Sequence, residues 1–260
     1  MTREEKSRNV GLARALSKLG YCSRSRAVEL IHAGRVQLNG TTRRNPETPV
    51  RLERDRIEVD RAVVGAEAKV YLMLNKPRGM LTTAADEKGR DTVYSCLPHG
   101  LPWVAPVGRL DKASEGLLLL TNDSEWAARI SDPETQLDKT YHVQVGALAS
   151  EAIPASMTAG VRTASGEVLC AKNARVLRVG ERNTWLEIVL DEGKNRQIRR
   201  MLEHLDLEVL RLVRVAVGPL VLGRLAKGAC RALTSDEKRA ADRAMKSPEA
   251  RNKRSVEKVR

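Results

Sequence analysis

The sequence GRLDKASEGLLLLTND occupies residues 108–123 and decides how the middle of the chain is interpreted. Its four consecutive leucines, residues 117–120, lie between Gly116 and a polar Thr-Asn-Asp group. An apolar run this short, with these boundaries, is typical of a buried strand rather than a helix. Asp111 and Arg109 precede the run in a turn-forming segment. We therefore expect a core strand with a carboxylate and a guanidinium at its entrance.

The segments around this strand predict the rest of a folded body. Residues 70–74, 140–145 and 184–190 are short apolar or alternating runs, as in strands, and residues 124–131 fit a helix. A second helix is expected from Asn195, because apolar residues recur there at helical spacing: Ile198, Met201, Leu202 and Leu205. Strands that return without regular βαβ spacing favour a mixed, mainly antiparallel α+β domain, which we place at residues 67–235.

A smaller α/β domain is expected at residues 10–66. Leucines at near-helical spacing end at Gly20, and a second apolar set ends at Gly34, after Ser23 or Ser25 as the N-cap. An alternating strand and the turn Asn39-Gly40 follow. Two short helices on a small sheet would gather five cations: Arg14, Lys18, Arg24, Arg26 and Arg35. These residues form either an RNA-binding surface or the ordinary charged face of a structural domain.

Charge points to a polyanionic partner. The 260 residues include 46 Lys+Arg and 33 Asp+Glu, a net charge of +13. Residues 1–66 carry +6, residues 67–235 only +3, and residues 236–260 carry +4. We expect a nearly balanced body with a basic arm at residues 1–9 and a basic, solvated and disordered tail at residues 236–260. With 3% aromatic residues, phosphate contacts are favoured over extensive base stacking.

Composition also excludes several classes of protein. No apolar run approaches the ~20 residues of a membrane span, and the first residues lack the apolar core of a secretory signal. The four cysteines, Cys22, Cys96, Cys170 and Cys230, lie far apart, so neither a metal site nor a disulfide framework is expected. A reducing cytoplasmic location fits this usage.

The sequence contains no familiar nucleotide or metal motif. A P-loop, a GxGxxG after a strand, an HExxH and a GxSxG are all missing, and the four histidines are scattered. The remaining candidate for chemistry is Asp111, a carboxylate in a basic, turn-rich setting. The alternative is that Asp111 is an ordinary turn residue at the edge of a strand.

Two family resemblances sharpen these expectations. Residues 15–27 and 30–40, ALSKLGYCSRSRA and LIHAGRVQLNG, resemble the S4 RNA-binding domain in order and spacing. Residues 108–123 resemble the catalytic motif of the pseudouridine synthases, in the RsuA-type branch that carries an N-terminal S4 domain. Three further segments of that family are matched by NKPRG at 75–79, KTY at 139–141 and EGKNRQIRRM at 192–201. One departure is Lys112-Ala113-Ser114, where the family often has an acidic residue and a Thr; activity is expected to survive it.

The resemblance implies isomerisation of uridine to pseudouridine on a flipped-out nucleotide, with no cofactor. Asp111 would be the catalytic carboxylate, either adding to the nucleotide or taking the proton from C2′. Lys194 is the cation expected to keep it ionised. Arg109 would fill the gap left by the flipped base, and Tyr141 would stack on the uracil and assist removal of the proton from C5. Ile198 either forms an apolar wall of the pocket or packs in the helix core.

The resemblance also implies the partners. Arg196, Arg199 and Arg200 would follow phosphates, or form a solvated helix face. The substrate is expected to be ribosomal RNA, free or in an assembly intermediate, with large-subunit RNA first and small-subunit RNA second; the protein is expected to be a monomer. The rival functions are a catalytically inactive RNA-binding assembly factor and another S4-bearing enzyme, such as a methyltransferase or a tRNA ligase. The second rival would require a Gly-rich cofactor loop, which the sequence lacks.

Overall fold

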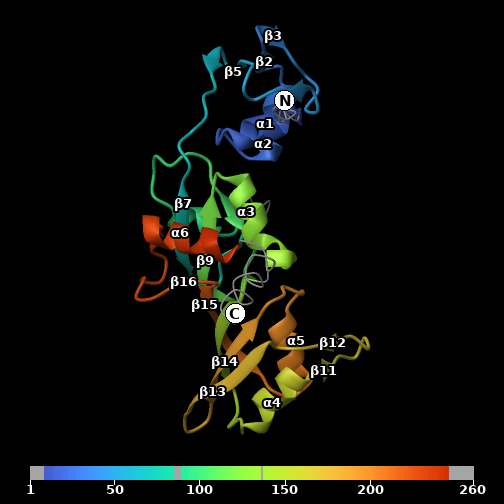
Figure 1. The fold of residues 1–260 in the computed structure, drawn as a ribbon, viewed down its shortest axis with the longest axis vertical. Helices are drawn as coiled ribbons and strands as arrows, with labels where there is room; N and C mark the ends of the chain where they lie inside the picture. Colours follow the sequence, from blue (N-terminus) through green and yellow to red (C-terminus); the bar gives the residue numbers. More distant parts are fainter. Residues whose placement is uncertain (1–8, 85–88, 136, 246–260) are drawn as a thin grey trace, which may run out of the picture. The chain divides into compact units, whose positions relative to one another are not determined.

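The computed structural model describes residues 9–84, 89–135 and 137–245 (Figure 1). They form two compact units. The first comprises residues up to Tyr71 together with residues 98–105 and 120–124, and the second comprises the rest. The basic arm expected at residues 1–9 lies outside the described residues except for Asn9. None of the described helices combines the length and apolar character that a membrane crossing requires.

The first unit contains the expected helix pair and small sheet. Ser23 accepts a hydrogen bond from the Arg26 amide and is the N-cap of the second helix. Asn39 and Gly40 both have positive φ, as the turn of the hairpin demands. Buried aliphatic side chains of both helices and of the sheet make one core. Its elements are α1 (Leu12–Lys18), α2 (Arg24–His32), β1 (Val10–Gly11), β2 (Val36–Leu38), β3 (Thr41–Thr42), β4 (Pro49–Val50), β5 (Ile57–Val59) and β6 (Ala62–Val63).

The second unit is built on a mixed sheet in the order β13-β14-β10-β15-β9-β7-β17, with β8 paired to β9 and β16 paired to β15. One pairing, β15 with β9, is parallel. The leucine run forms β9, all of whose residues are buried. The strands are β7 (Tyr71–Lys76), β8 (Ala105–Val107), β9 (Glu115–Thr121), β10 (Lys139–Val145), β13 (Asn173–Val179), β14 (Thr184–Leu190), β15 (Val209–Val217), β16 (Leu220–Val221) and β17 (Cys230–Ala232).

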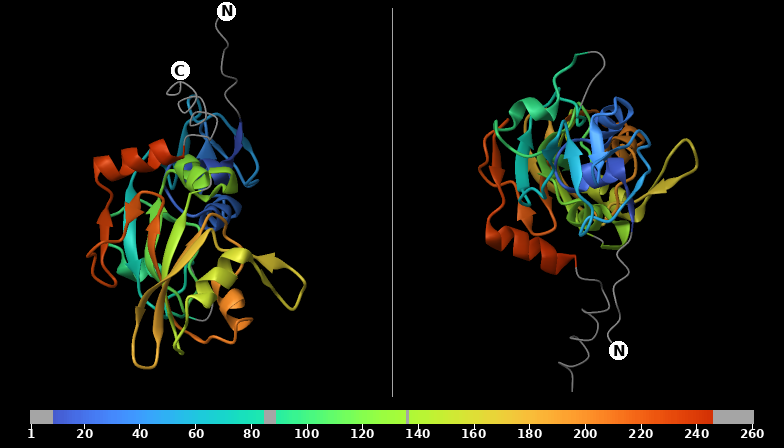
Figure 2. Two further views of the ribbon diagram at one scale, coloured as in Figure 1. Left: turned by 60° about the horizontal axis from the view of Figure 1, so that its bottom comes forward. Right: turned by 90° about the horizontal axis from the view of Figure 1, so that it is seen from above.

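Helices cover one side of the β13-β14-β10 part of the sheet (Figures 1 and 2). Met157 of α4 and three residues of α5 share a core with Val143, Leu186 and Ile188 from the strands. The expected strands and the helix at residues 124–131 are confirmed. The remaining elements are α3 (Ser124–Ser131), α4 (Ala152–Ala159), α5 (Gln197–Glu203), the hairpin β11 (Val161–Arg162) and β12 (Val168–Leu169), and the 3-10 turns η1 (Val93–Cys96) and η2 (Pro133–Thr135).

The expectation of a disordered tail from residue 236 is wrong for its first part. Residues Ser235–Ala244 form helix α6. Thr234 and Glu237 make a reciprocal capping box, and Arg231 binds Glu237 through two 2.7 Å hydrogen bonds. Asp242 accepts a 3.0 Å hydrogen bond from the indole of Trp126, which is buried. Caps and ion pairs thus order a segment that composition alone assigns to solvent, while residues 246–260 lie outside the described part.

Candidate active site

Asp111 lies in the loop that leads from β8 into β9. The Ser114 amide donates to the Asp111 carbonyl at 3.0 Å and closes a tight turn. The hydroxyl of Thr82 donates to the Leu110 carbonyl at 2.7 Å, and Leu110 is buried. The carboxylate itself is exposed, with 43% of the side chain accessible. The loop is therefore fixed through its backbone while its carboxylate faces outward.

Lys76, the last residue of β7, holds this loop from beneath. Its side chain is fully buried. Its Nζ donates to the carbonyl oxygens of Pro77 at 3.1 Å, Asp111 at 3.2 Å and Ser114 at 2.9 Å. Burial lowers the pKa of Lys76 to about 8, against the pull of the neighbouring Asp111 and Glu115 carboxylates. Sequence reasoning identified residues 75–79 only as a turn and as a family segment, and it missed this lysine.

The cation beside Asp111 is Arg196. Its Nη1 lies 3.7 Å from Oδ2 of Asp111. Arg196 has left-handed backbone angles, φ 47° and ψ 33°, and is the N-cap of α5. The helix expected from Asn195 therefore begins at Gln197. A non-glycine residue in this conformation is uncommon and tends to mark a functional site.

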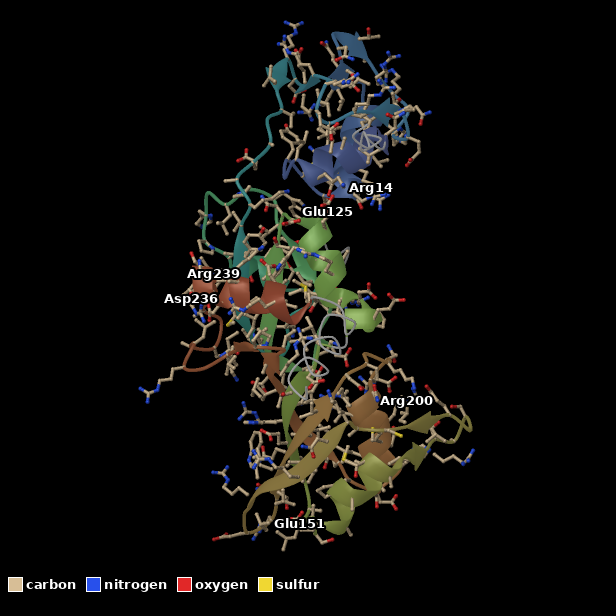
Figure 3. The ribbon with its side chains drawn as sticks, viewed as in Figure 1. Arg14, Glu125, Glu151, Arg200, Asp236 and Arg239 are labelled. Atoms are coloured by element: carbon tan, nitrogen blue, oxygen red, sulfur yellow. The ribbon has the colours of Figure 1, made fainter. Side chains whose placement is uncertain are left out.

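Lys194, the cation expected at Asp111, pairs elsewhere. Its Nζ lies 3.3 Å from Glu192 and 3.6 Å from Glu167. The hydrogen bond with Glu192 raises the pKa of Lys194 above its ordinary value. Arg200, labelled in Figure 3, also binds Glu167, at 2.6 Å. Two nearby glutamates thus compete for the lysine, a feature that the motif position does not reveal.

Other cations surround the loop. Nη2 of Arg199 donates to the Ala113 carbonyl at 3.2 Å, whereas its buried Nε has no hydrogen-bond partner among the described residues. Burial and the nearby Arg196 and Arg78 lower the pKa of Arg199, and Asp111 opposes this. Arg196 and Arg199 therefore both contact the loop that carries Asp111, whereas Nη1 of Arg78 donates to the Leu210 carbonyl at 3.2 Å. Such a group of cations suits an anionic substrate.

Tyr141 and Ile198 belong to the α5 side of the sheet. Tyr141 is half-buried on β10, opposite Ile188 of β14, and packs against the core. Ile198 is 4% exposed and belongs to that core, which gives it a packing role whatever else it does. Arg109 is exposed and makes no hydrogen bond or ion pair with any described residue. The structure thus joins Asp111 to Arg196 and leaves Arg109 unengaged.

The loop is anchored to a close strand junction. Gly116 of β9 pairs with Arg214 of β15, and a Cβ at Gly116 would overlap the Arg214 backbone. The φ of Gly116 is +101°, which favours glycine. Glu115, 3% exposed, binds Arg211 at 3.1 Å and Lys227 at 2.6 Å. The glycine required at this junction is the one that follows the catalytic-motif loop in the sequence.

The five cations of the first unit differ in their surroundings. Arg14 (Figure 3) and Arg24 are exposed. Arg26 is paired with Glu29 at 2.7 Å, and Arg35 is paired with Asp60. Lys18 is half-buried. Arg14 and Arg24 therefore have the guanidinium groups most available to a ligand.

Comparison with known proteins identifies the family of this chain. The profile of the RNA pseudouridylate synthase family matches residues 70–204, and the S4 domain profile matches residues 10–57. The chain belongs to the RNA pseudouridylate synthase family. The enzyme is an RNA-modifying isomerase with an N-terminal S4 domain, so the expected fold class and architecture are confirmed.

Individual relatives agree. The ribosomal large subunit pseudouridine synthase B of Bacillus subtilis is 36% identical over 87% of this chain and 93% of its own. An uncharacterized RNA pseudouridine synthase of Aquifex aeolicus is 38% identical over 88% of this chain and 92% of its own. A crystal structure described as a pseudouridylate synthase superposes with a TM-score of 0.63 at 28% identity, covering 89% of this chain and 99% of that chain. The similarity therefore extends across both units of the enzyme.

Proposed function

We propose that the enzyme converts a uridine of large-subunit ribosomal RNA into pseudouridine, with Asp111 as the catalytic carboxylate. The observation that carries this proposal is the exposed Asp111 carboxylate, 3.7 Å from Arg196, on a loop fixed by buried Lys76. The large subunit is supported as the target because the Bacillus subtilis relative is a ribosomal large subunit pseudouridine synthase. A cytoplasmic monomer acting during ribosome biogenesis, on free RNA or an assembly intermediate, completes the proposal.

The reaction is an isomerisation. The N1–C1′ bond breaks, the uracil turns within the site, and a C5–C1′ bond forms. C5 then loses its proton and N1 gains one, so no atom is added or removed. Asp111 either adds to the nucleotide or takes the C2′ proton, and in both routes the Arg196 guanidinium lies 3.7 Å from the reacting carboxylate.

The remaining residues would flip the target base, stack on it and hold the RNA during the isomerisation. The target base must leave its stack, at a cost of a few kcal/mol, and exposed Arg109 would occupy the vacated place. Tyr141 would stack on the uracil and assist removal of the C5 proton. Arg196, Arg199 and Arg200 would hold the flanking phosphates, and the S4 domain would grip structured RNA through Arg14, Lys18, Arg24, Arg26 and Arg35.

The test is Asp111→Asn in a strain that lacks the native gene. Pseudouridines of both ribosomal RNAs would be mapped by carbodiimide-stopped primer extension, with wild type and Asp236→Asn as complementing controls. We expect one large-subunit site to be restored by both controls and not by Asp111→Asn, whose RNA affinity should stay near wild type. Turnover by Asp111→Asn without deamidation would contradict the catalytic assignment. A restored site in small-subunit RNA would contradict the target.

A further inference from the structure

The side of the sheet opposite α4 and α5 is polar and basic. Strand register puts Arg178, Trp185, Gln144 and Arg211 in one row across β13, β14, β10 and β15. Paired residues in a sheet share a face. The adjacent row contains Arg175, Glu187 and His142. We call Arg175, Arg178, Trp185, His142, Gln144 and Arg211 the polar face.

This surface is open to solvent. The side chain of Arg175 is 61% exposed and that of Arg211 is 43% exposed. Arg178 is exposed and has no hydrogen bond or ion pair with any residue in the described ranges. The residues that alternate with these in the same strands, such as Leu186 and Ile188, are fully buried in the core. The strands are therefore two-sided, and the polar face lies on the far side from Tyr141 and α5.

The arginines on the polar face are held in position, with donors left over. Arg175 uses Nε to bind Glu187 at 2.7 Å, and His142 lies 3.4 Å from the same carboxylate. Arg211 lies over the Trp185 ring at 5.6 Å and binds Glu115 through Nε and Nη2. Both carboxylates are thereby paired with cations, while Arg178 adds a cation that has no ion pair within the described part of the chain. An oriented arginine loses less conformational entropy when it binds a phosphate.

We propose that the polar face is a second RNA-binding surface, which holds a segment of the ribosomal RNA outside the target loop. The polar face lies on four neighbouring strands of the sheet and combines oriented guanidinium groups with the Trp185 ring. This combination suits a sugar–phosphate backbone and an unstacked base. The proposal rests on the proposed function, because it takes ribosomal RNA as the substrate. It adds a binding site on the side of the sheet away from Asp111.

The test compares full-length wild type with Arg178→Glu and Trp185→Leu. Arg239→Glu on α6 (Figure 3), 61% exposed, is the matched control for charge. The probes are the organism's large-subunit RNA, transcribed in vitro with 4-thiouridine, and a short uridine hairpin. We expect Arg178→Glu to weaken binding of the long RNA about tenfold and to make its salt slope shallower by about 0.7–0.9, with hairpin binding unchanged. Trp185→Leu should remove photo-crosslinks from the peptide that spans residues 173–189.

The outcomes separate the explanations. The proposal would be overturned if Arg178→Glu bound the long RNA with the same affinity and salt slope as Arg239→Glu, and if the wild type gave no crosslinks to residues 173–189. If Arg178→Glu bound protein-free RNA normally but no longer bound assembled ribosomal particles, a ribosomal protein would occupy the polar face. That result would also overturn the proposal. Equal loss on the hairpin, or a lowered melting temperature, would mean a general defect and count against a second site. If the proposed function fails, wild type forms no pseudouridine or does not prefer this RNA, a result independent of Arg178.

Discussion

Two cations are candidates for the charged partner of Asp111, and their surroundings differ. Arg196 lies 3.7 Å from the carboxylate, whereas Lys194 is shared by Glu192 and Glu167. The pair is an ion pair at 3.7 Å between side chains that are 52% and 43% exposed, and exposed ion pairs contribute about 0.2–1 kcal/mol, so Arg196→Ala should lower single-turnover kcat by about 1.5-fold to fivefold. Lys194→Ala removes a cation that pairs with Glu192 and Glu167, and should leave kcat nearly unchanged. Tritium release from RNA labelled at C5 measures both, and the reverse order would restore Lys194 to the role.

Lys76 gives the fold a distinctive dependence on pH. Its pKa is lowered from 10.5 to about 8, so between these values the unfolded chain binds the proton and the folded chain does not. Stability from this group therefore rises with pH across that window, by up to about 3 kcal/mol. Lys76→Met should be less stable than wild type at pH 7, because three carbonyls lose their donor, and the deficit should widen by pH 10. Denaturant titrations at the two pH values measure it, and a deficit independent of pH would contradict the shift.

Among the elements, the parallel junction of β9 and β15 leaves no room for a side chain at Gly116. Gly116→Ala would put a Cβ into the Arg214 backbone at a φ that disfavours side chains. We expect a loss of at least about 2 kcal/mol in unfolding free energy, from backbone strain and forced separation of the strands. Gly193→Ala, where a Cβ meets open space, is the control and should change stability little. Equal melting temperatures for the two variants would show that the junction relaxes freely.

The elements that the sequence predicts well are those whose pattern depends on burial alone. The leucines of β9 and the alternation in β10 and β14 report directly on the core. Helix α6 is not predicted, although Thr234 and Glu237 stand at capping-box spacing, because the charge and low apolar content of residues 236–260 favour a solvated tail. The basic edge strand β13 was missed because only one of its faces is apolar and a bulge breaks its alternation.

The candidate site was predictable only in part. Asp111 stands out from the residues that precede the core strand. The partners of Lys76 are backbone carbonyls. Every residue has a backbone carbonyl, so no pattern in the sequence predicts these contacts. The choice of Arg196 over Lys194 depends on a left-handed backbone residue and on the approach of Glu167, which is distant from Lys194 in the sequence. Both features arise only when the chain is folded.

At the scale of the whole molecule, RNA affinity should depend on which cations are free. The double variant Arg14→Ala, Arg24→Ala removes two exposed cations and should make the slope of log K against log salt shallower by about 1.4–1.8. The double variant Arg26→Ala, Arg35→Ala removes cations already paired with Glu29 and Asp60, so its slope should change less. Binding isotherms at several salt concentrations measure these slopes. Equal slopes for both variants and wild type would mean that these four arginines make no phosphate contacts.

The three carbonyls that bind Lys76 also bear on how this enzyme can evolve. Each contact from the lysine to the catalytic loop is made to main-chain oxygen, and Gly79 adds a 2.7 Å hydrogen bond to the Lys112 carbonyl. Side chains at 112 and 113 are therefore released from holding the loop in place. The segment Lys112-Ala113-Ser114 can therefore depart from the residues that the family often has there without loss of the turn. Positions 112 and 113 also offer room for neutral drift, and a library randomised there should retain folded members whose preference among RNAs differs.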